Sequence, residues 1–209
     1  MFIVFEGVEG SGKSTQSRLL SEWMTREGIP NVLTREPGGT QVGEEIRRAL
    51  LHGGDVPPRT ELLLMVAARA SFVAQVVRPA LERGEIVIAD RFELSSFAYQ
   101  GYGRGLPLAD VRRVNEFATD GLRPDITILL DVEPHEGAAR RERAGAAPDR
   151  IEKAGDDFHH AVARAYRLLS ESEPGVAVIR GDVPPNMVQA RIRGVLQERF
   201  PETFPPGQG

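Results

Sequence analysis

The sequence predicts an α/β fold of three layers, with a five-stranded parallel sheet flanked by helices. Five short apolar runs of strand length are separated by segments with helical periodicity. The runs are continuously apolar rather than alternating, which is typical of strands that are buried on both faces. With 209 residues, 41% of them apolar, the chain can build a substantial core, and we expect a single domain over residues 1–200.

Each predicted strand begins and ends next to polar or turn-forming residues. The five strands are expected at residues 2–6, 31–34, 85–90, 125–131 and 175–179. The six helices between and after them are expected at residues 14–27, 41–51, 60–77, 108–119, 156–173 and 185–200. Gly28 and Pro30 end the first helix, and Pro79 is expected to kink or end the third, which has room to continue to Arg83.

Composition excludes several classes of function. The chain has no cysteine, so it has no disulfide, thiolate zinc site or cysteine nucleophile. A net charge of -4 disfavours a nucleic-acid polymer as partner. We found neither a signal peptide nor an apolar run long enough for a membrane helix, so we expect no membrane partner and a cytoplasmic location. Residues 201–209 hold three prolines and two glycines, which predicts a mobile tail.

Residues 7–14 match the phosphate-binding pattern G-x-x-x-x-G-K-[ST] between the first predicted strand and the first helix. The glycines let backbone N–H groups turn toward phosphate oxygens, and the helix dipole favours the same anion. Lys13, one of only two lysines, adds a positive charge for the β- and γ-phosphates, and the Ser14 hydroxyl can ligate Mg²⁺. The predicted ATP contacts are Gly7, Val8, Glu9, Gly10, Ser11, Gly12, Lys13, Ser14 and Thr15.

Among proteins with this loop, a small kinase fits best. A GTPase needs N-K-x-D and D-x-x-G motifs, and the chain has neither. A motor-type or helicase-like ATPase would ordinarily carry further domains and a strand ending in Asp-Glu. This chain is short, and none of its predicted strands ends in that pair. A kinase for a charged acceptor must neutralise two anions and exclude water, which requires arginines around both. The chain has 24 arginines, and most of them are explained by its bias towards Ala, Gly, Pro and Arg.

Several short stretches together resemble bacterial thymidylate kinase, in the order that the family has them. They lie at residues 5–15, 34–40, 67–69, 90–92, 98–101 and 149–152. The resemblance implies the P-loop nucleoside monophosphate kinase fold and the ATP-dependent phosphorylation of dTMP to dTDP in dTTP biosynthesis, with Mg²⁺ and a homodimer. The alternatives are a kinase for another nucleoside monophosphate or small metabolite, and a noncatalytic nucleotide-binding protein.

The end of the third predicted strand carries Asp90 and Arg91, where open α/β sheets usually bind ligands. The resemblance implies that Arg91 grips the acceptor phosphate, together with Arg35 and Arg47, and that Asp90 holds the metal through water. It also implies a cis peptide bond before Pro37.

The resemblance also implies a set of contacts to the base and sugar of the acceptor. Arg69 would bind thymine O4 and Gln100 would read the base beside it. Met65 stands where the family commonly has an aromatic residue, and its polarizable sulfur can cover a ring face. Around the sugar the resemblance places Tyr99 against the 2′ position, Glu9 at the 3′-hydroxyl, and Ser96 in the lining of the same region.

Residues 135–152 are rich in arginine, alanine and glycine and resemble the lid of this family. In some members the catalytic arginine lies in the P-loop, but residues 8–11 include none here, so we expect it in the lid. We favour Arg143, then Arg141, and expect Arg140 to cover adenine; Arg150 completes the lid set. The predicted catalytic residues are thus Lys13, Arg91, Arg143 and Arg141.

Overall fold

Five parallel strands form the centre of the structure, in the order β2-β3-β1-β4-β5. The computed structural model describes residues 1–145 and 149–205. The strands are β1 (Phe2–Glu6), β2 (Asn31–Arg35), β3 (Ile86–Asp90), β4 (Ile126–Asp131) and β5 (Val176–Arg180). All four ladders are parallel, which confirms the predicted sheet.

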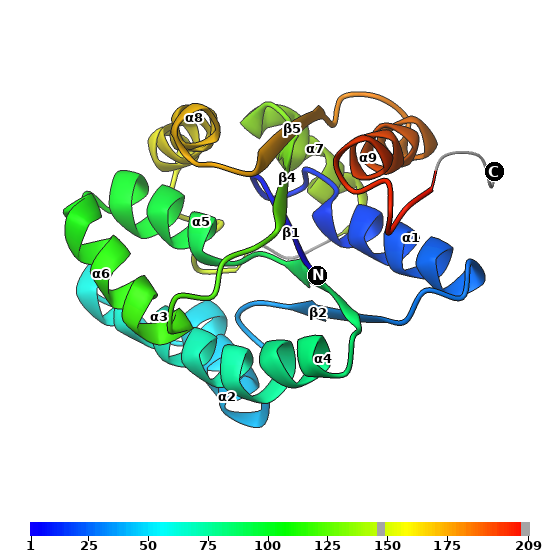
Figure 1. The fold of residues 1–209 in the computed structure, drawn as a ribbon. Helices are drawn as coiled ribbons and strands as arrows, with labels where there is room; N and C mark the ends of the chain where they lie inside the picture. Colours follow the sequence, from blue (N-terminus) through cyan, green and yellow to red (C-terminus); the bar gives the residue numbers. More distant parts are fainter. Residues whose placement is uncertain (146–148, 206–209) are drawn as a thin grey trace.

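Alternate side chains of β1 belong to two different cores. Ile3 and Phe5 pack with α1 (Lys13–Arg26) and α9 (Pro185–Arg199), which lie side by side on one face of the sheet (Figure 1). Phe2 and Val4 face the opposite layer. Because both faces are covered, every residue of β1 is buried, as its continuous apolar run predicted.

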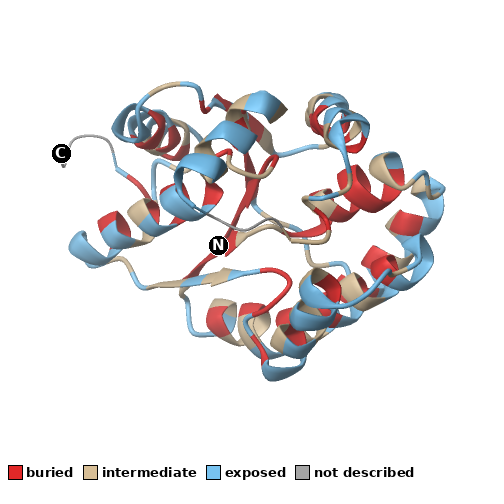
Figure 2. Ribbon diagram, turned by 180° about the vertical axis from the view of Figure 1, so that it is seen from behind, coloured by how far each residue is buried: buried red, intermediate tan, exposed pale blue. Residues whose placement is uncertain are grey.

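The opposite layer contains most of the helices, and burial is concentrated in the three central strands β1, β3 and β4 and on the inward-facing sides of the helices (Figure 2). Its elements are α3 (Pro58–Phe72), η1 (Val73–Val77), α4 (Arg78–Glu82), α5 (Glu93–Ser96), η2 (Phe97–Gly103), α6 (Leu108–Thr119) and α8 (Asp156–Ser172). Two further helices complete the described fold: α2 (Gln41–His52) packs on α3, and α7 (Pro134–Arg143) contacts α8.

The third predicted helix does not end at Pro79. Helical structure runs without a break from α3 through η1 to the end of α4 at Glu82. The π-helical turn η1 lies immediately before Arg78 and Pro79, and a widened turn is one way in which a helix accommodates the missing proline N–H. By length and composition this continuous helix, Pro58–Glu82, could cross a membrane, but the buried core helix of a domain meets the same test.

Two further expectations need correction. The segment that forms α5 and η2 was not predicted to be helical. The predicted mobile tail is wrong for Phe204, which is 1% exposed and whose ring centroid lies 5.8 Å from that of Trp23 on α1. Residues 206–209 of that tail lie outside the described residues.

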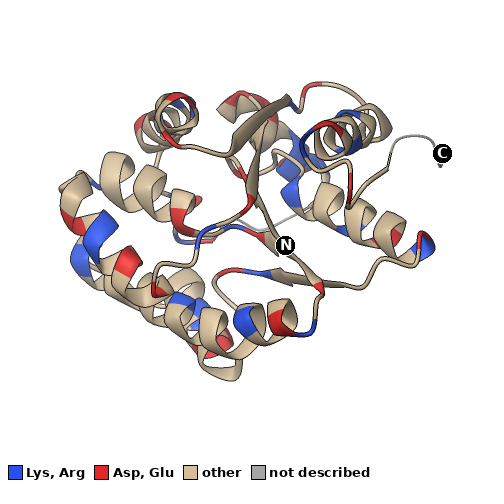
Figure 3. Ribbon diagram, viewed as in Figure 1, with Lys and Arg blue, Asp and Glu red and all other residues tan. Residues whose placement is uncertain are grey.

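The strand order places a change of chain direction beside β1. The chain crosses from β1 to β2 and β3 on one side and then to β4 on the other, so the carboxyl end of β1 is a switch point where open sheets bind ligands. The glycine-rich loop follows β1, and Asp90 ends its neighbour β3. Basic and acidic residues are interspersed along the helices (Figure 3).

Candidate functional site

The loop between β1 and α1 is bent by left-handed backbone and closed by its lysine. Gly10 has φ 74° and lies so close to α7 that an added Cβ would be 2.1 Å from the carbonyl oxygen of Gly137, so no other residue fits there. Lys13 is buried, and its Nζ donates to the carbonyl oxygens of Gly7 and Val8, at 2.9 and 2.8 Å. The loop is therefore held as a cradle by its own lysine.

The charge of Lys13 depends on its surroundings. Burial, and then repulsion by Arg91, lowers the pKa of Lys13 to about 8, against the opposing attraction of Asp90 and Glu9. A phosphate anion at the loop would add a further negative charge and favour the protonated lysine. The electrostatic energy of the site thus becomes more favourable when an anion binds.

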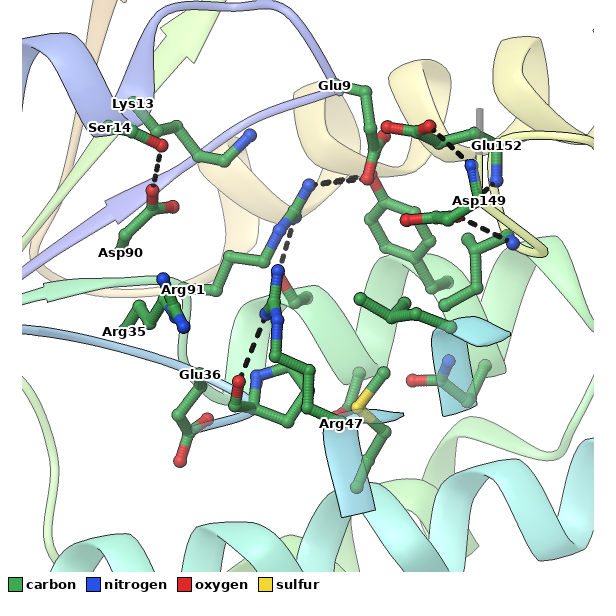
Figure 4. Close-up of a pocket in the computed structure, with 18 of the residues that line it drawn as sticks. Glu9, Lys13, Ser14, Arg35, Glu36, Arg47, Asp90, Arg91, Asp149 and Glu152 are labelled. Carbon is green, nitrogen blue, oxygen red and sulfur yellow. Dashed lines mark hydrogen bonds and ion pairs between the residues drawn. The ribbon is translucent and has the colours of Figure 1, made fainter. Parts of the chain in front are cut away.

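Ser14 and Asp90 bring two oxygen ligands together beside the cradle. The Ser14 hydroxyl donates to Asp90 Oδ2 at 2.5 Å (Figure 4). Among the described residues no group of three or more acidic or histidine side chains could hold a metal by itself. One carboxylate and one hydroxyl fit Mg²⁺, which normally keeps several waters and takes further ligands from nucleotide phosphates.

Arg91 projects from a strained turn at the end of β3. Its φ is 80°, a value that side-chain-bearing residues seldom adopt and that often marks functional sites. Through its two terminal nitrogens Arg91 donates to Glu9 Oε1 at 2.7 Å, to the hydroxyls of Tyr99 and Tyr166 at 3.1 Å each, and to Ser95 Oγ at 2.9 Å. These contacts fix the guanidinium before any ligand arrives.

Three arginines converge on one cavity. Arg35, Arg47 and Arg91 all line it, and Figure 4 shows Arg47 and Arg91 extending toward one another. Arg47 donates to the carbonyl oxygen of Pro37 at 3.0 Å, and the Glu36-Pro37 bond is cis, as the family resemblance implied. Burial, and then the charge of Arg35, lowers the pKa of Arg47. Like charges held this close favour an anion between them.

At the far end of this cavity, Arg69 is almost fully used by protein contacts. Its guanidinium donates to Glu36 Oε2 at 2.8 Å, to Ser96 Oγ at 2.9 Å, to the carbonyl oxygen of Phe92 at 3.0 Å, and to Asn115. Burial raises the pKa of Glu36 to about 7 despite the Arg69 charge. Within residues 1–145 and 149–205, Glu36 Oε1 has no hydrogen-bond partner, so this end of the cavity holds an unused acceptor.

The remaining predicted acceptor contacts also lie in this cavity. Met65 and Gln100 line it, and so do Ser96, Glu9 and Tyr99. Tyr99 donates to Glu9 Oε2 at 2.5 Å, and Glu9 in turn faces Arg91. Burial raises the pKa of Glu9, but the charges of Arg91 and Lys13 outweigh it and hold that pKa below its usual value. Two of the predicted sugar contacts, Glu9 and Tyr99, therefore form one hydrogen-bonded group with Arg91. The third, Ser96, accepts from Arg69 instead.

A second cavity lies on the other side of the cradle. The first cavity has a volume of about 310 Å³ and the second about 580 Å³. The second is lined by residues 10–16 and by Arg140, together with Gly181 and Val188 near α9. Both cavities share Gly10, Lys13, Ser14 and Arg141. Two ligands could therefore occupy them and meet at Lys13.

The four lid arginines have different surroundings. Arg141 lines both cavities and pairs with Glu152 at 2.5 Å, whereas Arg143 lines neither cavity, and its Nε donates to the Ala139 carbonyl oxygen at 3.2 Å. Arg140 donates to the Gly181 carbonyl oxygen at 2.8 Å in the second cavity.

Arg150, the fourth of the set, lines neither cavity. It donates to the Leu50 carbonyl oxygen at 2.7 Å and to Glu61 at 2.6 Å. The predicted lid residues 146–148 lie outside the described residues.

Sequence reasoning missed several acidic and hydroxyl groups of the site. Glu6 accepts from the Phe92 and Ser95 backbone N–H groups at 2.9 and 3.1 Å and from the hydroxyls of Ser95 and Tyr166 at 2.6 and 2.8 Å. An acidic residue at the end of an apolar strand was a signal that could have identified Glu6. Tyr166 lies on the amphipathic helix α8, where nothing distinguishes it from a core aromatic residue.

Because the cavities meet at a P-loop lysine and arginines line the far side, the site can hold a polyphosphate and a second anion together. Proteins that do this on a parallel α/β sheet are P-loop kinases of nucleoside monophosphates and similar small acceptors.

Comparison with known proteins narrows this class. The family model described as "Thymidylate kinase" matches residues 5–192. The thymidylate kinase of Desulforudis audaxviator (strain MP104C) is 48% identical, over 95% of this chain and 93% of that protein. The thymidylate kinase of Synechococcus sp. (strain JA-3-3Ab) is 47% identical, over 98% of this chain and 99% of that protein. The chain belongs to the thymidylate kinase family.

Proposed function

We propose that this protein transfers the γ-phosphoryl group of ATP to the 5′-phosphate of dTMP, giving ADP and dTDP. The observation that carries the proposal is the meeting of two cavities at Lys13 and Arg141. ATP occupies the larger cavity with its polyphosphate in the cradle, and dTMP occupies the smaller one with its phosphate among Arg35, Arg47 and Arg91. Membership of the thymidylate kinase family supports dTMP as the acceptor.

Catalysis in this arrangement consists of positioning and charge neutralisation. Lys13 and the loop N–H groups hold the donor phosphates, and Arg91 holds the acceptor oxygen in line with the γ-phosphorus. Arg91 can do so because Glu9, Tyr99 and Tyr166 fix its guanidinium. The negative charge that develops between the two phosphates is neutralised from both sides.

Arg141 is the better candidate for the lid arginine that neutralises the transferring phosphoryl group. It lines both cavities, while Arg143 is exposed and bonded to its own helix. We propose that Arg140, which donates to the Gly181 carbonyl oxygen in the second cavity, covers adenine. The preference for Arg143 from sequence is therefore replaced by Arg141 in this proposal.

Mg²⁺ is part of the proposed reaction. Ser14 and Asp90 would hold it, directly or through water, as their paired oxygens suggest. The bound ion would supply charge neutralisation between the donor phosphates.

At the base end, the proposed contacts are Arg69 and Gln100 to the thymine edge and Met65 to its face. Tyr99 lies against the 2′ position, with Ser96 in the same wall and Glu9 toward the 3′-hydroxyl. All six line the acceptor cavity, which supports the assignment. Since Arg69 already binds four protein groups, its main contribution in this proposal is to hold Glu36 and Ser96 in place beside thymine O4.

We also propose a homodimer and a cytoplasmic location. Leu63 on α3 is 58% exposed and Phe117 on α6 is 90% exposed, and these two helices pack against each other, so they offer an apolar surface to a second copy. A chain without cysteine is compatible with the reducing cytoplasm.

A coupled assay with ATP and Mg²⁺, comparing dTMP, dUMP, dCMP and dGMP as acceptors, tests the function. We expect dTMP to have the highest kcat/KM. A preference for another monophosphate would support the alternative of a different nucleotide kinase, and ATP binding without transfer to any acceptor would support a noncatalytic protein.

A further inference from the structure

Glu61, a residue outside both cavities, is the centre of a buried hydrogen-bond network. It lies in the first turn of α3 and is 0% exposed. Its Oε1 accepts from Gln100 Nε2 at 2.8 Å and from Arg104 Nε at 3.2 Å. Its Oε2 accepts from Arg104 at 3.2 Å and from Arg150 at 2.6 Å. A buried carboxylate with two arginines and an amide around it is fully paired.

The network keeps Glu61 ionised. Burial raises the pKa of Glu61, but the hydrogen bonds from Gln100, Arg104 and Arg150 outweigh it and hold that pKa below its usual value. The first turn of a helix also favours a negative charge. An ionised carboxylate can only accept hydrogen bonds, so the group of Gln100 that faces it must be the amide nitrogen.

This constraint decides what Gln100 presents to the acceptor cavity. Gln100 lines that cavity and is only 2% exposed. Its nitrogen is committed to Glu61, and no donor among residues 1–145 and 149–205 bonds its amide oxygen. The oxygen is therefore left to accept a hydrogen bond from a ligand.

A hydrogen-bond acceptor at this position distinguishes pyrimidines by their N3 atom. Thymine and uracil carry an N3–H donor, whereas cytosine has a bare N3 acceptor that would face the Gln100 oxygen without a proton. When a buried acceptor expects a hydrogen-bond donor, a ligand without that donor leaves the acceptor unpaired. The resulting loss of affinity is larger than the loss that an apolar pocket causes for a ligand of slightly different size.

We propose that Glu61 is a positioning residue for acceptor specificity, because it fixes the Gln100 amide with its oxygen toward the base and so selects bases that carry N3–H. This proposal rests on the proposed function, since it requires a nucleotide base in the cavity. Glu61 touches no substrate and acts only through Gln100. Arg104 and Arg150 hold the Glu61 carboxylate in place and are not themselves part of the recognition.

The test is the ratio of kcat/KM for dTMP to that for dCMP in wild type, Glu61→Gln and Arg104→Gln. The Glu61→Gln amide can offer either its oxygen or its nitrogen, so Gln100 is free to turn over. We expect the ratio to fall by about tenfold or more, through a higher KM for dTMP with a smaller change in kcat. Arg104→Gln also disturbs the buried network but leaves the carboxylate facing Gln100, so its ratio should stay near that of wild type.

Equal losses for dTMP and dCMP in Glu61→Gln, as in Arg104→Gln, would show a merely structural role and overturn the proposal. A wild type that does not prefer dTMP would instead refute the proposed function. Should Glu61→Gln fail to fold, the side-chain amide protons of Gln100 can be followed by NMR in the ligand-free wild type, assigned by their loss in Gln100→Leu. One protected proton supports the fixed amide; rapid exchange of both contradicts it.

Discussion

At the scale of single residues, the site contains positive charges that the fold holds in unfavourable surroundings, away from solvent and close to other positive charges. Lys13 is buried beside Arg91, and Arg47 is half-buried beside Arg35. In each case a bound phosphate would relieve both the repulsion and the loss of solvation. Phosphate binding would therefore be strongest at the groups that are proposed to neutralise the transferring phosphate. The charges of the ligand-free site therefore support the proposed positions of the two anions.

Lys13→Met should abolish most activity and should remove a pH-dependent contribution to the stability of the ligand-free protein. Loss of one charge at the transferring phosphate typically lowers kcat about 100- to 1,000-fold. Burial lowers the pKa of Lys13 from 10.5 to about 8. Below pH 8 the charged, buried lysine therefore lowers the free energy of unfolding by about 3 kcal/mol. Between pH 8 and 10.5 the unfolded chain binds the extra proton, so the stability of wild type rises relative to that of Lys13→Met.

Urea unfolding at pH 7 and at pH 9.5 measures both parts of this prediction. Lys153→Met is the matched control, because the only other lysine of the chain is exposed. The stability of Lys153→Met should differ from that of wild type by the same amount at both pH values. A stability difference between wild type and Lys13→Met that is the same at pH 7 and pH 9.5 would contradict the electrostatic account of the cradle.

At the scale of elements, α7 connects the cradle to the lid. Gly137 on α7 lies against Gly10, and the next two turns of the same helix carry Arg140, Arg141 and Arg143. Successive helical positions point about 100° apart, so only some of these side chains can face the cavities. Sequence indicated that the lid supplies an arginine, but the rotation of the helix, fixed by the Gly10 and Gly137 contact, decides which one.

Arg141→Ala should therefore lower kcat about 1,000-fold or more, as expected for an arginine that neutralises a transferring phosphoryl group. Arg143→Ala serves as the matched control from the same helix and should retain most of the wild-type kcat. Steady-state kinetics with saturating dTMP and ATP measure both. The reverse order would restore Arg143 as the catalytic residue.

The C-terminal segment is a second element whose role differs from expectation. Phe204 fills the core between α1 and α9, against Trp23, although prolines follow it directly in the sequence. Phe204→Ala should lower the free energy of unfolding by about 3 to 5 kcal/mol, the usual cost of removing a buried phenylalanine. Leu168→Ala, at a position that is 53% exposed, should change it by less than about 0.5 kcal/mol. Equal effects in chemical denaturation would mean that the segment is not part of the folded core.

At the scale of the whole molecule, the parts that sequence predicted are those set by local pattern. The strands, the cradle and the boundaries of α6 follow from apolar runs, glycine spacing and helical periodicity. The segment of α5 and η2 was missed because its serines, aromatic residues and glycines do not form an amphipathic repeat, and the surrounding core makes it helical. Glu61 was missed because its three partners come from positions 100, 104 and 150, which only the fold brings together.

The same distinction applies to the arginines. The compositional bias of the chain explained most of them without assigning them a role. Three of these arginines nevertheless lie over aromatic rings, with their guanidinium carbons 4.4 to 4.9 Å from the ring centroids. The pairs are Arg104 with Phe158, Arg112 with Phe97, and Arg193 with Trp23. Long basic side chains can cover aromatic surface in this way while their charge stays partly solvated. Single sequence positions do not reveal such contacts because the two partners lie on different elements.

The exposed apolar side chains of α3 and α6 lead to a prediction about assembly. Phe117 is 90% exposed, which is unusual for a phenylalanine in a monomer, and α6 packs beside α3, where Leu63 is also exposed. If two copies bury this surface, Phe117→Glu should shift the protein to a monomer, because a charge would then be buried without a partner. Leu168→Glu, on α8, is the matched control and should leave the dimer intact. Light scattering after size-exclusion chromatography measures the mass of each; a wild type that is monomeric at its highest soluble concentration, or a Phe117→Glu variant that remains dimeric, would exclude this surface as the interface.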